Sequence, residues 1–351
     1  MDNNNKNNNI ALFACAKNEH DYIYEWIYYH LKIGFDHIYI CDTSDDNNMK
    51  SCTFNTDSRV TLLHEPLHGK QFGPLQPIFQ TKYNNEIFKS KYKWCAFIDV
   101  DEFIVPKKHA NIKDLLNSIN FDIGSLGINW VLFGNNYHEN KEKIPVIKRF
   151  TKCKNIYDRH IKSIVNTNSV HYFNNPHFAF LSQGNQVNEK GKQYNQGPWQ
   201  ENSSVDLIQI NHYVVKSTEE YLIRTKNHHC RNTNVQDNSH FIHHNCNNIQ
   251  DKTAYNILMS NSYHTNIDEL DYEFYIQHYD DLLVNGIFNK ELAYNHFIFE
   301  GKKENRISNL NFNYYYYKLH NKDLEKFSNI QLWNHFKNNG IKEERKYKIN
   351  N

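Results

Sequence analysis

The segment FIDVDEFIV, residues 97–105, places three carboxylates between two apolar runs: Asp99, Asp101 and Glu102. Charged side chains are rarely buried without a partner. In a strand, Asp99 and Asp101 would point to the same face, where two carboxylates resist joint ionisation unless a cation lies beside them. Mg²⁺ or Mn²⁺ resolves that conflict, and such ions commonly complete their coordination shell with water and a phosphate. The pair therefore indicates a metal site for a phosphate-containing ligand, and the alternative is an acidic strand end that is solvated or caps the next helix. Glu102 would point away and order the loop.

The elements that would position these carboxylates alternate between strand and helix. Residues 10–16, 36–42, 59–65 and 93–103 are short apolar runs, and residues 21–34 and 73–91 have helical spacing. This alternation predicts an α/β fold with a doubly wound, mostly parallel sheet. Ligands bind at the carboxyl ends of strands in such sheets, which is where the carboxylates fall.

The order of elements is less regular beyond residue 120. Residues 125–133, 160–166 and 205–215 are strand-like, and Ser217 with Glu220 fits a capping box that opens a helix. The Asn- and His-rich stretch 227–250 has no clear periodicity and is predicted to be a loop.

Composition limits the possible partners and compartments. The 351 residues include 40 Lys and Arg against 39 Asp and Glu, and a net charge of +1 gives no general attraction to nucleic acid or anionic membranes. No apolar run is long enough for a transmembrane helix. Seven cysteines without a CxxC pair do not suggest a disulfide framework, so we expect a reducing, cytoplasmic location, including the virion or host cytoplasm if the chain is viral.

The C-terminal part contains an internal repeat. Residues 295–306 and 334–345 both fit NHFxxxGxKExR, and each copy belongs to a unit of helical character. We expect a disordered tail at 1–9, one large domain at 10–265 and a two-copy helical repeat module at 266–351. The module would serve packing or bind a protein partner.

Several ordered motifs together resemble GT-A-fold glycosyltransferases close to families 2 and 92. They are AKNEHDYIYEWIYYHLKIGFDHIYICDTSDD, GPLQPIFQTKY and WCAFIDVDEFIV, followed by NWVLFG, HIKSIVN and INHYVVKSTEEYLIRTK. The later repeat is similar to modules appended to bacterial glycosyltransferases. The resemblance implies a hexosyltransferase that uses Mn²⁺ or Mg²⁺. It would move a sugar from a nucleotide-sugar donor, expected to be a UDP-sugar, to a hydroxyl of a glycan, protein or lipid-linked acceptor, with inversion.

The resemblance also assigns roles around the metal. Asp99 and Asp101 become the DxD pair, in which Asp101 contacts the metal and Asp99 holds the ribose or a metal-bound water. His212 matches the histidine that completes the metal shell. A hydrogen-bonded core histidine is the alternative for His212.

Further donor contacts are expected along the same edge of the sheet. Asp42 would accept a hydrogen bond from a nucleobase N–H, and Glu19 is either a donor contact or a first-turn helix residue. The remaining candidates are Asn18 near the nucleoside, Gln80 on the helix before the DxD strand, and Lys162 and Lys216 near the diphosphate. Gln80 and each of the two lysines could instead be a surface residue. The sequence does not identify the general base, for which Asp158 is the candidate.

Three other functions compete with this interpretation. A phosphatase of the haloacid-dehalogenase type also places DxD after a strand, but Phe103 departs from its motif. A zinc site could use Cys230, Cys246 and the histidines at 228, 229, 240, 243 and 244, although the spacing fits no standard pattern. A non-catalytic protein that keeps the fold and binds a partner is the third alternative.

Overall fold

The chain divides into two compact units, Met1–Leu258 and Met259–Asn351. The computed structural model describes residues 9–109, 111–119, 123–195, 197–201, 203–227, 239–260, 270–304, 306–308, 312, 314–340 and 342–347. The predicted N-terminal tail, apart from Asn9, and the predicted domain boundary at 265 and 266 lie outside these residues.

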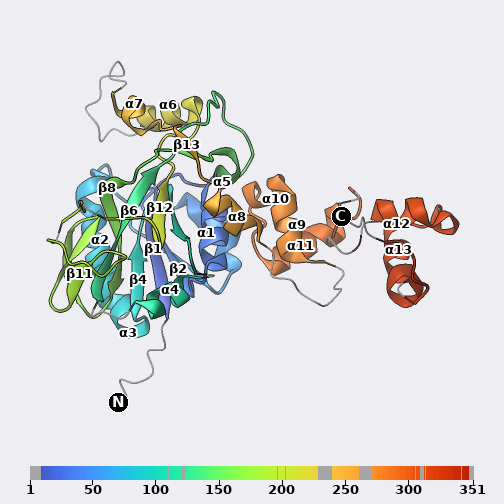
Figure 1. The fold of residues 1–351 in the computed structure, drawn as a ribbon, viewed down its shortest axis with the longest axis horizontal. Helices are drawn as coiled ribbons and strands as arrows, with labels where there is room; N and C mark the ends of the chain where they lie inside the picture. Colours follow the sequence, from blue (N-terminus) through green and yellow to red (C-terminus); the bar gives the residue numbers. More distant parts are fainter. Residues whose placement is uncertain are drawn as a thin grey trace, which may run out of the picture. The chain divides into compact units, whose positions relative to one another are not determined.

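A nine-stranded mixed sheet forms the centre of the first unit, in the order β3-β2-β1-β4-β8-β6-β12-β5, with β11 beside β6 (Figure 1). Its strands are β1 Ile10–Ala16, β2 His37–Asp42, β3 Val60–His64, β4 Trp94–Phe97, β5 Glu102–Pro106, β6 Ile123–Leu132, β8 Asp158–Asn166, β11 Asn185–Val187 and β12 Ile208–His212. Strands β3, β2, β1 and β4 run parallel, β8 is antiparallel to both β4 and β6, and β12 is parallel to β6. The predicted α/β class is therefore confirmed.

Two small sheets complete the strands of this unit. One pairs β9 (Val170–Asn175) with β10 (Phe178–Leu181), and the other pairs β7 (Lys152–Cys153) with β13 (Ile249–Gln250). The helices of the unit are α1 Ile23–Lys32, α2 Phe72–Tyr83, α3 Lys89–Lys91, α4 Ile112–Ser118, α5 Val146–Arg149, α6 Thr218–Asn227, α7 Ser239–His244 and α8 Thr253–Met259. Short 3-10 turns occupy Asn48–Ser51 and Thr53–Thr56, and a π-helical turn, Asn84–Phe88, joins α2 to α3.

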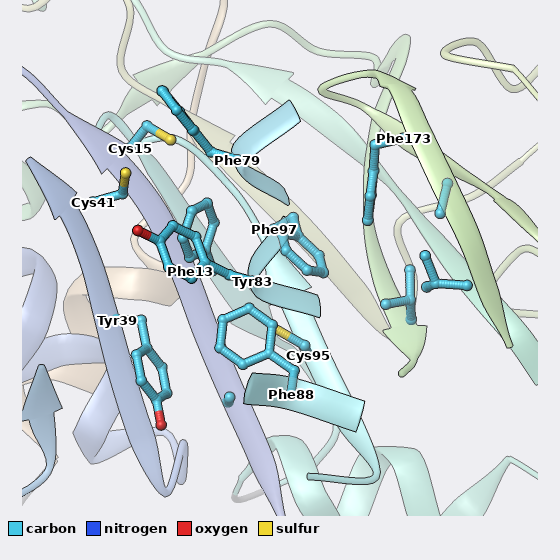
Figure 2. Close-up of a cluster of buried hydrophobic side chains, with 14 of the residues drawn as sticks. Phe13, Cys15, Tyr39, Cys41, Phe79, Tyr83, Phe88, Cys95, Phe97 and Phe173 are labelled. Atoms are coloured by element: carbon cyan, nitrogen blue, oxygen red, sulfur yellow. The ribbon is translucent and has the colours of Figure 1, made fainter. Parts of the chain in front are cut away.

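Helices cover both faces of the sheet, with α1 and α2 on opposite sides in Figure 1. Alternate residues of β1 enter the core beneath α2, because successive side chains of a strand point to opposite faces. Figure 2 shows this cluster, in which Phe13 lies among aromatic rings from β4, α2 and the π-helical turn. The ring centroids of Phe13 and Phe97 are 5.6 Å apart, and those of Phe13 and Tyr83 are 5.7 Å apart. This aromatic packing fixes the strands whose ends carry the candidate site.

Glu25 ties α1 to α5 from a buried position. Its side-chain oxygens accept hydrogen bonds from the backbone N–H groups of Val146, at 2.6 Å, and Ile147, at 2.8 Å. Burial raises the pKa of Glu25 to about 7, although these two donors and nearby Arg149 oppose the shift. The folded protein therefore favours the protonated carboxyl.

We expect this carboxyl to make stability depend on pH. Its ordinary pKa is near 4.5 and its pKa in the folded protein is about 7. Its contribution to the free energy of unfolding is therefore fully present below pH 4.5 and is lost as the pH rises through 7. Between pH 5 and pH 8, the free energy of unfolding measured in urea should fall by roughly 2 kcal/mol more for wild type than for Glu25→Gln. Histidines titrate equally in both proteins, so parallel pH dependence would contradict the raised pKa.

The structure corrects two predictions about local structure. The prediction of one strand over residues 93–103 was wrong in part. Strand β4 ends at Phe97, and the backbone turns before β5 begins. In this turn, Glu102 N donates a hydrogen bond to Asp99 O at 3.0 Å. Strand alternation therefore does not orient Asp99 and Asp101. The predicted loop at 227–250 contains α7 and β13, and residues 228–238 lie outside the described part.

The second unit is helical in the part that the structure describes. Its elements are α9 Tyr272–His278, α10 Asp280–Val284, α11 Lys290–His296, α12 Tyr314–His320 and α13 Asn329–His335. Two π-helical turns, Phe297–Gly301 and Phe336–Gly340, follow α11 and α13, and a 3-10 turn, Lys322–Leu324, follows α12. The two sequence copies make matching contacts between a tyrosine and a histidine and between an arginine and an aspartate: Tyr275–His296, Tyr317–His335, Arg306–Asp281 and Arg345–Asp323.

The repeated glycine has a packing role in both copies. A Cβ added at Gly301 or Gly340 would lie 2.0 Å from the hydroxyl of Tyr275 or Tyr317, respectively. Within the described residues, no helix combines the length and the apolar character needed to cross a membrane.

Candidate functional site

The candidate residues gather at one edge of the central sheet. Strands β1, β2, β4, β6 and β12 share one direction, so their carboxyl ends meet at this edge, where antiparallel β8 begins. Asp42 ends β2, His212 ends β12, and Asp99 and Asp101 follow β4. The structure therefore brings together residues that are far apart in the sequence.

Asp99 lies at the centre of a polar cluster. Its Oδ2 accepts a 2.7 Å hydrogen bond from Lys162 Nζ, and its Oδ1 accepts one of 2.7 Å from Gln76 Nε2. Glu102 Oε2 accepts from the Asp99 backbone N–H at 2.9 Å and lies 3.7 Å from Lys162 Nζ. Glu102 thus holds the turn, as predicted, while 35% of the Asp99 side chain remains exposed.

Charge balance in this cluster depends on one fully buried ammonium group. Burial opposes ionisation of Lys162, but Asp99 and Glu102 outweigh it and raise its pKa. Burial likewise disfavours ionised Asp99, yet Lys162 keeps the pKa of Asp99 below its usual value. The pKa of Glu102 is raised well above its ordinary value, chiefly by burial. Lys162 is therefore committed to carboxylates, and its predicted contact with a diphosphate stays a prediction.

Asp101 and His212 face one another across a short gap. Asp101 Oδ1 lies 3.7 Å from His212 Nε2, while Asp101 Oδ2 accepts a 2.7 Å hydrogen bond from Arg224 Nη1. Burial opposes ionisation of Asp101, but Arg224, His212 and Lys216 hold its pKa well below the usual range. Burial lowers the pKa of His212 to about 3, so its imidazole is neutral. A carboxylate and a neutral imidazole form a donor pair suited to a divalent cation.

The donor set at this edge fits a metal ion. Two ligands of one octahedral Mg²⁺ lie about 3 Å apart, slightly closer than the 3.7 Å between Asp101 Oδ1 and His212 Nε2. His212 Nδ1 is also buried, and no acceptor or donor among the residues that the structure describes fixes the ring through that nitrogen. Across the residues that the structure describes, no group of three or more His, Cys, Asp or Glu side chains could hold a metal alone. Any bound ion would therefore share its shell with water and a ligand.

The nucleoside candidates lie after β1 and at the end of β2. Asp42 is fully buried, and its Oδ1 accepts hydrogen bonds from the N–H and hydroxyl of Ser44, whereas its Oδ2 has no hydrogen-bond partner in the described part of the chain. Asn18 has a φ of 60°, and its Oδ1 accepts from Asn48 Nδ2 at 3.2 Å. Burial raises the pKa of Glu19, whose charged neighbours include Lys216 and Asp101. Glu19 therefore lies within electrostatic reach of the carboxylate cluster.

The family model for glycosyltransferase family 92 matches residues 81–271, which is more than half of the chain. The chain belongs to glycosyltransferase family 92. It is therefore a glycosyltransferase, an enzyme that moves a sugar from an activated donor to an acceptor. No curated protein matches the sequence at a significant level.

Solved structures resemble this glycosyltransferase only distantly. HddC from Yersinia pseudotuberculosis is 12% identical, with a TM-score of 0.29 over 52% of this chain and 89% of that chain. Core-mannan synthase A (CmsA/Ktr4) from Aspergillus fumigatus, in its Mn/GDP form, is 11% identical, with a TM-score of 0.22 over 40% of this chain and 46% of that chain. Scores this low carry no argument about the site.

The remaining predicted donor residues of the glycosyltransferase differ in how they are held. Gln80 is buried, and its Nε2 donates to Pro176 O at 3.2 Å, while its Oε1 has no hydrogen-bond partner within the described ranges. Lys216 is also buried, has a φ of 56°, and places its ammonium 4.4 Å from the ring centroid of Tyr22. Burial lowers the pKa of Lys216. Strained backbone conformations of this kind concentrate at functional sites.

Asp158, the candidate base, is engaged by its own strand. Its Oδ1 accepts from His160 Nδ1 at 2.7 Å and from the His160 backbone N–H at 3.0 Å. Its Oδ2 lies 3.7 Å from Lys154 Nζ. Burial opposes ionisation, but His160 and Lys154 hold the pKa of Asp158 well below its usual range. A carboxylate held in its ionised form by these contacts is a poor proton acceptor.

Sequence reasoning missed several residues of the site. Gln76 could have been identified, because it lies one helical turn before Gln80 and therefore on the same face of α2. Arg224 could also have been identified, because it lies one turn after Glu220 on α6, and the capping box had already located the start of this helix. Trp130 and His160 gave no signal, because ring contacts between neighbouring strands depend on the register of β6 and β8.

The described residues of the histidine-rich segment give no support to the zinc alternative. His240 Nδ1 pairs with the Tyr221 hydroxyl at 2.9 Å, and His244 Nδ1 with His240 O at 2.8 Å. His228, His229 and Cys230 lie outside the described residues.

Proposed function

We propose that this glycosyltransferase is metal-dependent and moves a hexose from a nucleotide-sugar, expected to be a UDP-sugar, to an acceptor hydroxyl with inversion. The observation that carries the proposal is the approach of Asp101 and His212 at the carboxyl edge of the sheet. Family membership supports the class of reaction. The acceptor would be a glycan, a protein or a lipid-linked sugar.

Asp101 Oδ1 and His212 Nε2 would hold Mn²⁺ or Mg²⁺, with Asp99 reaching the ribose or a metal-bound water. The ion, when bound, neutralises charge that develops on the leaving diphosphate. The partly exposed guanidinium of Arg224 and the buried ammonium of Lys216 add positive charge at the same edge. Such preorganised charge stabilises a leaving group without rearrangement of solvent.

The nucleoside would lie against the ends of β1 and β2. Asp42 Oδ2, which is buried and has no hydrogen-bond partner among the described residues, would accept a hydrogen bond from a base N–H, and this bond would satisfy an otherwise costly acceptor. Asn18 and Glu19 border this position from the segment after β1. Gln80 would act through the backbone at Pro176 rather than through direct contact.

A donor screen tests the proposal. Thermal stabilisation and hydrolysis or transfer should appear with a UDP- or GDP-sugar only when Mn²⁺ or Mg²⁺ is present, and chelation with EDTA should remove both. UDP-sugars should outperform GDP-sugars. If no nucleotide sugar in the panel gives either signal with either metal, the alternative of a non-catalytic binding protein replaces this proposal.

A further inference from the structure

Asp158 and His160 form an ordered carboxylate–imidazole pair at the start of β8. A carboxylate held in its ionised form can only accept hydrogen bonds, so the 2.7 Å contact requires the proton on His160 Nδ1. In the neutral form of the ring, the lone pair is therefore on Nε2. Among the described residues, Nε2 has no hydrogen-bond partner, and 37% of the side chain is exposed.

This imidazole lies close to the proposed metal ligands. The indole of Trp130, on β6, contacts His160 at a centroid distance of 5.0 Å and His212 at 4.2 Å. Strands β8, β6 and β12 are neighbours in the sheet (Figure 1). One ring thus separates His160 from the histidine that faces Asp101.

An exposed indole flanks His160 on its outer side. Trp199 is 53% exposed, its ring centroid is 6.1 Å from that of His160, and the Arg159 guanidinium lies 5.3 Å from it. Hydrogen bonds on either side of Trp199 fix its backbone, since Ile161 N donates to Pro198 O and Gln200 N to Arg159 O. An exposed aromatic face beside this imidazole suits a sugar ring, whose C–H bonds pack on the π surface.

We propose that His160 is the general base of this glycosyltransferase, that Asp158 positions it, and that Trp199 supports the acceptor sugar. This inference rests on the proposed inverting transfer. The acceptor hydroxyl gives its proton to His160 Nε2 while its oxygen forms the new bond to the anomeric carbon. The bond from that carbon to the nucleoside diphosphate breaks, and the diphosphate leaves with the electron pair. The imidazolium then releases its proton to water.

The charges around the imidazole are consistent with this role. Asp158 stabilises the imidazolium as it forms, as a buried carboxylate does for a catalytic histidine in other enzymes. Lys154 pairs with Asp158 from the preceding segment, Arg159 pairs with Glu201 at 3.6 Å, and the ring centroid of His177 lies 6.0 Å from that of His160. By contrast, Asp158 Oδ1 already accepts two hydrogen bonds, both from His160.

The test uses the full chain with the most active nucleotide sugar of the screen and a methyl glycoside as acceptor. His160→Gln should lower kcat roughly 10²- to 10⁴-fold while donor-dependent thermal stabilisation persists. Imidazole should partly restore transfer by His160→Ala. Asp158→Asn should lower kcat and shift the pH profile, and the matched control His171→Gln, at an exposed position on β9, should leave kcat unchanged.

The outcomes separate the base from the proposed function. Donor binding by wild type together with unchanged kcat in His160→Gln would overturn the base and leave the metal-dependent transfer intact. A wild-type chain that neither binds nor turns over any donor would overturn both. If Asp158→Asn loses transfer while His160→Gln retains it, Asp158 itself is the base.

Discussion

Replacing Asp101 with Asn is expected to lower sugar transfer roughly 10²- to 10³-fold or more and to abolish stabilisation by Mn²⁺. Asp101 Oδ1 is the carboxylate oxygen that approaches His212, and an amide oxygen binds a divalent cation much less strongly than a charged one. When the amide oxygen accepts the hydrogen bond from Arg224, the NH₂ group takes the place of Oδ1 and cannot bind the cation. Loss of activity with little change in the folded structure would therefore report on the metal. Initial rates and thermal melts with and without Mn²⁺ measure both effects.

Asp206→Asn provides a matched control for this substitution. Asp206 pairs with Lys190 at 3.0 Å, and both side chains are 58% exposed, so the change removes one negative charge away from the site. Transfer and metal stabilisation should be retained. If Asp101→Asn keeps the Mn²⁺ stabilisation of wild type, Asp101 is not a metal ligand and the proposed site is wrong.

Much of the fold follows from local sequence. The apolar run at 10–16 and the helical spacing at 21–34 correspond to β1 and α1, because parallel strands buried on both faces contain uninterrupted apolar residues. The capping box is also present, with Ser217 Oγ accepting from Glu220 N and Glu220 Oε2 accepting from Ser217 N. Each of these features depends on residues within about one helical turn or one strand.

The features that could not be predicted depend on contacts between distant segments. The sequence pattern predicts one strand over residues 93–103, but a turn at residues 98–101 interrupts it. Hydrogen bonds from Lys162 and Gln76 to Asp99 help to fix the carboxylates in this turn. The pairing of β12 with β5 places His212 opposite Glu102, a register that no local motif encodes. The identity of the groups around Asp99 therefore required the structure.

Lys162 is expected to be the residue of this site on which folding depends most strongly. Its ammonium is fully buried and lies 2.7 Å from Asp99 Oδ2 and 3.7 Å from Glu102 Oε2. Lys162→Met would leave these carboxylates without their cation, and removing one partner of a buried ion pair costs about 3–5 kcal/mol. Urea denaturation of the two proteins at neutral pH measures this difference in the free energy of unfolding.

The pH dependence of the deficit identifies its electrostatic origin. Without Lys162, Glu102 and Asp99 lose the charge that favours their ionised forms, so their pKa values in the folded state rise. A raised carboxyl pKa favours folding at low pH, so the deficit of Lys162→Met should shrink as pH falls. Lys190→Met, which removes an exposed lysine, should leave the unfolding midpoint unchanged. A deficit independent of pH would instead indicate lost packing of the lysine chain.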